Sequence, residues 1–211
     1  TIDSTTIIRA KVIVDGYLNQ PSNVSSYLFP NRELTLPVIS LAISPDYLWD
    51  DMIGIYTKGQ NGAYYYKLDD YFNWAQDWRR PVNMEYFVDG KEEINQLGEM
   101  RIMGGFSREK PQKSLAVYAN KRFGEKRFDY NFFQEKEPLD DGYKSIILRN
   151  SGQDFNRSFM RDAVNQYFVA GKIDIDYQAY QPAIVFLNGE YWGIHNIRER
   201  SNDDFVASNY D

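Results

Sequence analysis

Apolar and polar residues alternate along several short runs of this chain, a pattern that predicts β-strands. The first runs cover residues 7–14 and 24–29, with a turn signal at Asp15-Gly16. A continuous apolar run at 36–43 is typical of a buried strand. Two strands alone are only marginally stable in water. The first pair therefore either packs on a later part of the chain or is the remainder of a truncated β-module, and we favour the remainder.

Further strands are predicted in the second half of the chain. They fall at 82–88, ending in an Asp89-Gly90 turn, and at 99–103, 113–119 and 145–149. A hairpin is predicted around Asn188-Gly189, the strongest short-range hairpin signal, with strands at 183–187 and 191–197. Its first strand is apolar on both faces, which favours a central position with a cover on either side. Residues 45–49 suit a helical turn capped by Ser44, and 54–80 show no regular pattern.

One main helix is expected at 159–168. Its apolar residues recur on one face at helical spacing, Arg161 falls at the edge of this stripe and Asp162 lies further round. Strands followed by a helix and a hairpin predict the α+β class, with a mostly antiparallel sheet, one main helix and additional N-terminal strands.

Composition narrows the possible chemistry. The 211 residues allow one domain of ordinary size, or one domain with part of another. The chain has no cysteine and one histidine, His195, which excludes thiolate and iron–sulfur sites and argues against zinc. The formal charge of −6 argues against non-specific nucleic-acid binding. The longest apolar run is far too short to span a bilayer.

Candidate ligand-binding residues are few. The loop of Gly104, Gly105, Ser107 and Arg108, followed by Lys113, could cradle a phosphate with backbone amides and neutralise it with the lysine. On local grounds alone, a glycine turn beside a solvated lysine is the favoured interpretation.

Other polar features are equally open to a plain structural interpretation. Arg161 and Asp162 could direct charge into a cleft or lie on a solvated helix flank. Glu199 could orient a ligand or mark an exposed end of a strand. We expect His195 to be buried with a hydrogen-bonded ring. The four Asp-Asp pairs at 50–51, 69–70, 140–141 and 203–204 lack the spacing of a calcium loop.

Aromatic residues are concentrated in the irregular segment. Tyr64-Tyr65-Tyr66, Tyr71-Phe72, Trp74 and Trp78 could stack on sugar rings, or pack on one another as a separate cluster.

Several segments, taken in order, resemble the CotH (spore coat protein H) family. They are 36–41 (LPVISL), 54–56 (GIY), 78–82 (WRRPV), 100–108 (MRIMGGFSR), 111–115 (PQKSL), 148–154 (LRNSGQD), 160–163 (MRDA) and 186–200 (FLNGEYWGIHNIRER). Residues 6–29 are similar to the last strands of a chitobiase C-terminal-type β-sandwich. The resemblance divides the chain into a module tail at 1–29 and the N-terminal part of a CotH-like domain at 30–211.

The resemblance implies an atypical, kinase-like fold that binds ATP with Mg or Mn and phosphorylates protein, in a secreted or surface protein of bacteria. The strands and helix would correspond to a kinase small lobe. Lys113 would neutralise phosphate beside the loop from Gly104 to Arg108, while Arg161 and Asp162 would belong to the helix that orients the site. The catalytic and metal-binding aspartates are expected beyond Asp211, so we expect this fragment to be inactive.

A second hypothesis comes from a different class of function. The chain could be a non-catalytic cell-surface interaction module, or one that binds a surface glycan. The aromatic segment and the chitobiase-like strands motivate it.

Overall fold

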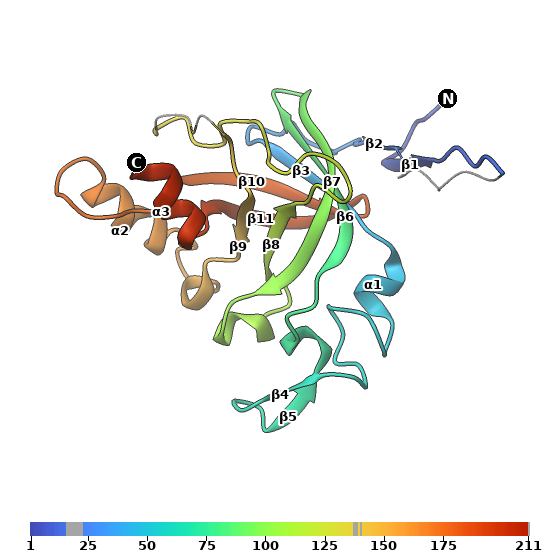
Figure 1. Ribbon diagram of the computed structural model, residues 1–211, viewed down its shortest axis with the longest axis horizontal. Coiled ribbons are helices and arrows are strands. Elements are labelled where there is room, and N and C mark those ends of the chain that lie inside the picture. Colours follow the sequence, from blue (N-terminus) through green and yellow to red (C-terminus); the bar gives the residue numbers. More distant parts are fainter. Residues whose placement is uncertain (16–22, 137–138, 140, 211) are drawn as a thin grey trace.

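Seven strands form a closed barrel in the computed structural model, which describes residues 1–15, 23–136, 139 and 141–210 (Figure 1). Around the barrel the strand order is β10-β11-β9-β8-β7-β6-β3. The strands are β3 (Val38–Ala42), β6 (Arg80–Val88), β7 (Lys91–Met103), β8 (Ser114–Ala119), β9 (Ser145–Arg149), β10 (Tyr180–Leu187) and β11 (Glu190–Glu199).

The pairing of β3 with β10 closes the barrel. These two strands run parallel, with Ile184 opposite Val38 and Leu187 opposite Leu41, whereas the other neighbouring pairs of the barrel are antiparallel. Beyond the strand end, the Asn188 amide donates to the Leu41 carbonyl at 2.8 Å. The Asn188 side-chain oxygen accepts from the Ile43 amide, also at 2.8 Å.

Two tight hairpin turns have the backbone conformation that their residue types favour. Asp89 and Gly90 have φ of 50° and 76°, and Asn188 and Gly189 have φ of 52° and 84°. Positive φ at both central residues is the type I′ geometry, whose twist matches that of the flanking strands. The turns predicted at Asp89-Gly90 and Asn188-Gly189 are therefore confirmed.

The barrel is filled by apolar side chains from its inner faces, including Ile39, Leu41, Val185 and Leu187. A second cluster covers the outside of the closing strands, where Val38, Ile184 and Phe186 are buried. Leu28, Leu34, Leu36 and Phe87 pack against this outer cluster. The prediction that the strand before Asn188 is central and covered on both faces is confirmed.

The predicted α+β class with a kinase-like small lobe is wrong, because the protein is mostly β and its sheet closes on itself. An open sheet needs a helix to cover one face, whereas a closed barrel covers its inner face with its own strands. Helix α2 (Arg161–Val169) accordingly buries Ala163 alone, and the rest of its expected core stripe is exposed or nearly so. The prediction also missed the first half of β7.

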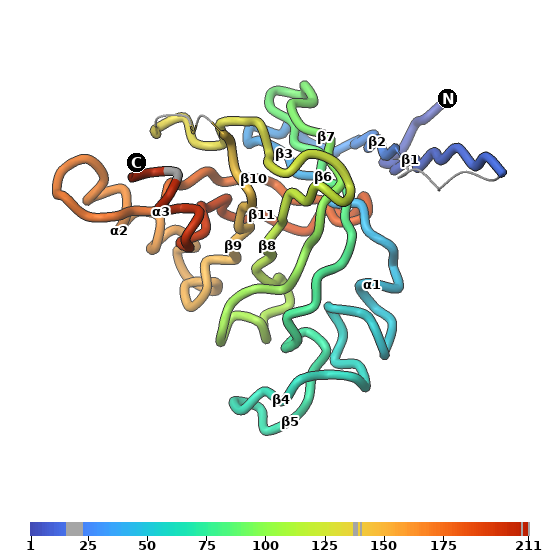
Figure 2. The backbone as a smooth tube through the Cα atoms, viewed as in Figure 1, coloured from blue at the N-terminus to red at the C-terminus, as the bar shows by residue number. Residues whose placement is uncertain are grey.

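Smaller elements project from the barrel (Figure 2). Helix α1 (Pro45–Trp49) has Ser44 at its N-cap position, without a side-chain hydrogen bond. The predicted irregular segment contains a small hairpin, β4 (Ala63–Tyr65) with β5 (Asp70–Phe72), followed by a 3₁₀ turn at Asn73–Ala75. Further 3₁₀ turns lie at Phe106–Glu109 and Gly152–Asp154, and α3 (Asp203–Asn209) is the last described helix.

The N-terminal strands β1 (Thr6–Ala10) and β2 (Asn23–Tyr27) pair with each other, and β2 contacts β6 of the barrel. The Ser26 amide donates to Glu85 Oε1 at 2.8 Å, and the Ser26 and Ser40 hydroxyls are 2.7 Å apart. Burial raises the pKa of Glu85, and its hydrogen bonds from Ser26 oppose that change. The predicted Asp15-Gly16 turn extends into residues 16–22, outside the described part of the chain. The chitobiase-type resemblance stays a prediction.

The buried placement of Leu41 in the barrel and the exposed placement of the α2 stripe can be tested by comparing two alanine variants. Leu41→Ala removes a side chain with no exposed surface and should lower the free energy of unfolding by about 2–5 kcal/mol. Phe168→Ala, on the exposed side of α2, should change it by about 0.5 kcal/mol or less. Urea unfolding followed by circular dichroism measures both. Equal losses would contradict the exposed placement of the α2 stripe.

Candidate functional site

A pocket of about 440 Å³ lies where the turn after β7, the segment after β9 and the first turns of α2 meet. Its lining residues are mostly polar or glycine: Gly104, Gly105, Phe106, Ser107, Arg149, Ser151, Gly152, Gln153, Asp154, Arg161, Asp162 and Asn165. Several of these were candidate ligand-binding residues in the sequence, although they come from three separate segments.

Asn150 holds two of these segments together. It is fully buried, and its side-chain oxygen accepts from the Ser114 hydroxyl at 2.8 Å and from the Gly152 amide at 3.0 Å. Its side-chain nitrogen donates to the Gln112 carbonyl at 2.7 Å. Because a buried amide left without partners is costly, this network fixes the chain after β9 against the start of β8.

Ser151 and Asp154 then direct the chain into α2. Ser151 has a left-handed backbone, and its hydroxyl donates to the Phe159 carbonyl at 2.5 Å. Asp154 accepts from the Ser158 hydroxyl at 2.5 Å and from the Arg161 amide at 3.1 Å. These bonds, led by the one from Ser158, lower the pKa of Asp154. The carboxylate of Asp154 therefore already occupies the positive end of α2.

The central charge of the site is Asp162, which is shared between two arginines. Arg198 Nη2 lies 3.0 Å from Asp162 Oδ2, and Arg149 Nε lies 3.3 Å from the same oxygen. Arg198 is 1% exposed, and burial lowers the pKa of its guanidinium, an effect that Asp162 opposes. Among the described residues, Nε and Nη1 of Arg198 and Nε of Arg149 have no hydrogen-bond partner, so the contact of Arg149 with Asp162 is an ion pair without a hydrogen bond. The side chain of Arg149 is 42% exposed and lines the pocket. Its guanidinium is therefore the cation of this cluster that a ligand in the pocket can reach.

The structure brings together five of the sequence-predicted residues, Gly104, Gly105, Ser107, Arg161 and Asp162. Gly104 has φ of 107°, a conformation that other residues rarely adopt. A Cβ placed on Gly105 would meet no atom within 4 Å, so its backbone faces open space. A ligand can therefore approach the main chain closely at this turn.

Arg108 does not line the pocket but fixes the shape of the turn. Its guanidinium donates to the Gly104 carbonyl at 2.5 Å, to the Ala75 carbonyl at 2.7 Å and to Asp77 Oδ1 at 2.8 Å. The contact from Arg108 is the main cause that lowers the pKa of Asp77. Arg108 is thus a support of the glycine turn.

Lys113 is also placed away from the pocket lining. It is buried, and its ammonium group donates to the carbonyls of Arg108 at 2.6 Å and Lys110 at 3.1 Å. It lies over the rings of Trp74 and Tyr56 at 5.0 and 5.6 Å. Burial lowers the pKa of Lys113 to about 8. This placement favours Arg149 over Lys113 as the cation that a phosphate would meet.

Glu199 lies outside the pocket lining as well. It is 2% exposed, pairs with Lys136 Nζ at 2.7 Å, and accepts from the Ala179 amide at 3.0 Å. The Glu199 carboxylate thus links Lys136 to Ala179, the residue before β10, so this side chain has a structural role.

His195 is buried with both ring nitrogens engaged, as expected. One nitrogen, Nδ1, lies 3.1 Å from Gln112 Nε2, and the other, Nε2, lies 3.1 Å from the Lys113 carbonyl. A neutral ring that accepts from the amide and donates to the carbonyl satisfies both contacts. Burial is the main cause that lowers the pKa of His195 to about 4.

The aromatic segment divides into a buried and an exposed face. Trp74 is buried, and its ring stacks on Phe72 with centroids 4.4 Å apart. Tyr64 and Tyr71 face each other across the β4–β5 hairpin on the exposed side, with ring centroids 5.5 Å apart. The interpretation that the rings pack on one another is therefore confirmed for the buried ones, while the exposed rings are accessible and stacking on sugar stays a prediction for them.

The sequence predicts no calcium loop at its Asp-Asp pairs and no apolar run long enough to span a membrane. Among the described residues, no group of three or more His, Cys, Asp or Glu side chains is arranged to hold a metal ion, and Asp140 of one acidic pair lies outside that part of the chain. Within the same residues, no helix has the length and apolar character needed to cross a membrane.

Three residues of the site, Arg149, Asn150 and Arg198, were not among the ligand-binding residues predicted from the sequence. A signal was present for Arg149 alone, because it directly follows the apolar strand residues 146–148. The meeting of the two arginines at Asp162 depends on the pairing of β9 with β11, which the sequence does not reveal.

A barrel with a glycine turn, an aspartate held by two arginines and a polar pocket between them defines a candidate anion-binding domain. The CotH kinase protein family matches residues 100–211, more than half of the chain, and the chain belongs to this family. The matched part contains the glycine turn, α2 and the strands that carry Arg149 and Arg198. Comparison with curated proteins finds no match.

The pKa of His195 leads to a prediction about stability. Between about pH 6.5 and pH 4 the unfolded chain binds a proton that the folded ring excludes, so stability falls as the pH falls through this window. The loss should be about 3 kcal/mol for this group. Urea unfolding at a series of pH values measures it.

His195→Gln provides the comparison for this effect. The variant should be less stable at pH 7 but should lack that part of the pH dependence. A protonated imidazole observed by NMR at pH 6 in the folded protein would contradict the buried, neutral state of the ring.

Proposed function

We propose that this chain carries the nucleotide-binding part of a CotH-family protein kinase, with the phosphates held in the pocket beside Arg149. The observation that carries the proposal is the convergence of the glycine turn with Arg149, Arg161 and Asp162 in one pocket. Membership of the CotH kinase family supports ATP as the ligand class.

Each residue has a distinct part in this proposal. Arg149 supplies a charge that can pair with phosphate oxygens, and its 3.3 Å ion pair with Asp162 keeps the guanidinium near the pocket. Arg198 holds Asp162 from the buried side at 3.0 Å, so the pair keeps its geometry without the ligand. The exposed backbone around Gly105 offers amide donors, and Arg161 adds a second charge at the rim.

Phosphoryl transfer needs more than this pocket, because carboxylates must hold a divalent metal against the phosphates. Mg or Mn, a protein acceptor and a secreted or surface location remain predictions from the family resemblance. The chain's own residues bind and orient the nucleotide in this proposal, and no transfer step is assigned to them.

Binding of ATP with Mg²⁺ to the full-length protein, measured by isothermal titration calorimetry, tests the assignment. Arg149→Ala should weaken binding by about tenfold or more, since a hydrogen bond to a charged group contributes about 1.5–3 kcal/mol. Arg149→Lys should restore part of it. The fold should persist in both variants because Arg198 still pairs with Asp162.

Two further variants make the result decisive. Arg122→Ala removes an exposed arginine elsewhere and should leave binding unchanged. Lys113→Met should lower the melting temperature, because two carbonyls lose their donor, while binding changes by less than about threefold. Loss of binding in Lys113→Met but not in Arg149→Ala would overturn the role of Arg149.

A second candidate function is recognition of a surface glycan by the β4–β5 hairpin. Tyr64 and Tyr71 are 53% and 60% exposed and lie side by side. The packed rings of Tyr65, Phe72 and Trp74 support the hairpin from within. Rigid exposed tyrosines offer apolar ring faces and hydroxyl groups to a sugar at little cost in side-chain entropy.

Titration with the soluble oligosaccharide chitohexaose, followed by tyrosine NMR signals, tests this candidate. The Tyr64→Ala/Tyr71→Ala double variant should weaken binding by about tenfold. Tyr167→Ala, an exposed tyrosine on α2, should have no effect. Equal binding by all three proteins, or none by the wild type, would remove the candidate.

A further inference from the structure

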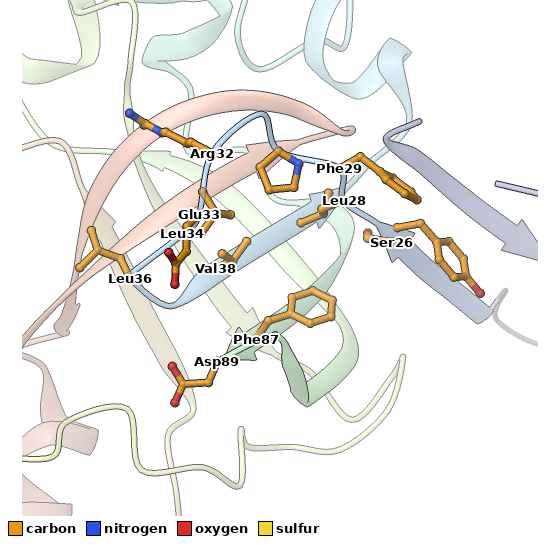
Figure 3. Close-up of a pocket in the computed structure, with 13 residues that line it drawn as sticks. Ser26, Leu28, Phe29, Arg32, Glu33, Leu34, Leu36, Val38, Phe87 and Asp89 are labelled. Atoms are coloured by element: carbon orange, nitrogen blue, oxygen red, sulfur yellow. The ribbon is translucent and has the colours of Figure 1, made fainter. Parts of the chain in front are cut away.

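A second pocket, of about 440 Å³, lies on the outside of the barrel, away from the glycine turn (Figure 3). It is formed between the connector from Ser26 to Leu36 and the outer faces of β3 and β6, next to the turn that contains Asp89. None of its lining residues belongs to the proposed nucleotide pocket. Its volume falls within the range of small-molecule sites.

The inner surface of this pocket is apolar. Val38 and Phe87 from the barrel face Leu28, Leu34 and Leu36 from the connector, and Figure 3 shows their side chains around a common space. The buried residues Ile184 and Phe186 support the cluster from β10. The barrel therefore supplies one wall of the pocket, through Val38 and Phe87, and the connector supplies the other.

The charged groups at the rim are two carboxylates and one arginine, from Glu33, Asp89 and Arg32. Neither Glu33 nor Asp89 has an ion-pair partner among the described residues. The guanidinium of Arg32 lies over the Tyr191 ring at 5.8 Å, and Figure 3 shows it pointing away from Phe87. Lys91, close to Asp89 in the chain, pairs with Glu93 at 2.8 Å.

We propose that this pocket binds a small molecule with an apolar body and a cationic amine head. The body would occupy the space between Val38, Phe87 and the connector leucines, where apolar surface is removed from water. The ammonium group would lie at the rim beside Glu33 and Asp89. A carboxylate of the same size would meet both negative charges, since Arg32 is directed elsewhere.

Three probes of matched shape test the proposal: 2-phenylethylamine, 2-phenylethanol and 3-phenylpropanoate. NMR titration of the full chain, followed at the signals of Val38, Leu34 and Phe87, gives a dissociation constant for each probe. The amine should bind at least fivefold more tightly than the alcohol, and the acid more weakly than the alcohol. The preference should shrink in 0.5 M salt, because the carboxylates are exposed.

Charge variants distinguish the contribution of the ammonium group to binding from that of the apolar body. In Glu33→Gln/Asp89→Asn, the dissociation constants of the amine and the alcohol should lie within twofold of each other. The dissociation constant of the alcohol should be unchanged from the wild type. Glu125→Gln/Asp129→Asn removes two exposed carboxylates elsewhere, matches the net charge and should keep the preference. A wild type that prefers the acid, shows no preference or gives no shifts at this pocket would overturn the proposal. So would a preference that survives the Glu33/Asp89 change.

Discussion

The parallel pairing of β3 with β10 is the constraint on which the rest of the structure depends. It joins residues 146 positions apart in the chain, such as Val38 and Ile184, and closes a sheet of otherwise antiparallel strands into a barrel. Closure removes the open sheet edges and gives every strand a buried inner face. It also creates the outer cluster around Val38, Ile184 and Phe186, on which the connector and the second pocket are built.

The same closure fixes the candidate nucleotide site. Because β9 lies between β8 and β11, the turn before β8, the segment after β9 and the side chain of Arg198 meet at one end of the barrel. The Asn150 network holds the segment there, and Asp154 sets the start of α2, so that Asp162 reaches both arginines. The arrangement of this pocket is thus a property of barrel geometry rather than of a single loop.

Local signals in the sequence were sufficient for individual elements but not for their arrangement. The Asn188-Gly189 hairpin, the buried strand at 36–43 and the buried His195 agree with turn chemistry and apolar pattern. Closure of the sheet depends on contacts between distant segments, and such contacts leave no local pattern in the sequence. The apolar stripe of α2 was wrongly expected to be buried, because amphipathic spacing does not say what a helix packs against. Gly104, Ser107 and Asp162, which were predicted to lie near one site, line one pocket. Lys113, which the resemblance implies as the phosphate-neutralising lysine, lies outside that lining.

Hydrogen exchange of the full-length protein with and without ATP·Mg²⁺, read by mass spectrometry, tests most directly whether the barrel-end pocket holds the nucleotide. We expect added protection in two segments, 104–107 and 149–165, with the connector at 26–36 unchanged. Protection confined to other segments, or none at saturating ATP, would contradict nucleotide binding at this pocket.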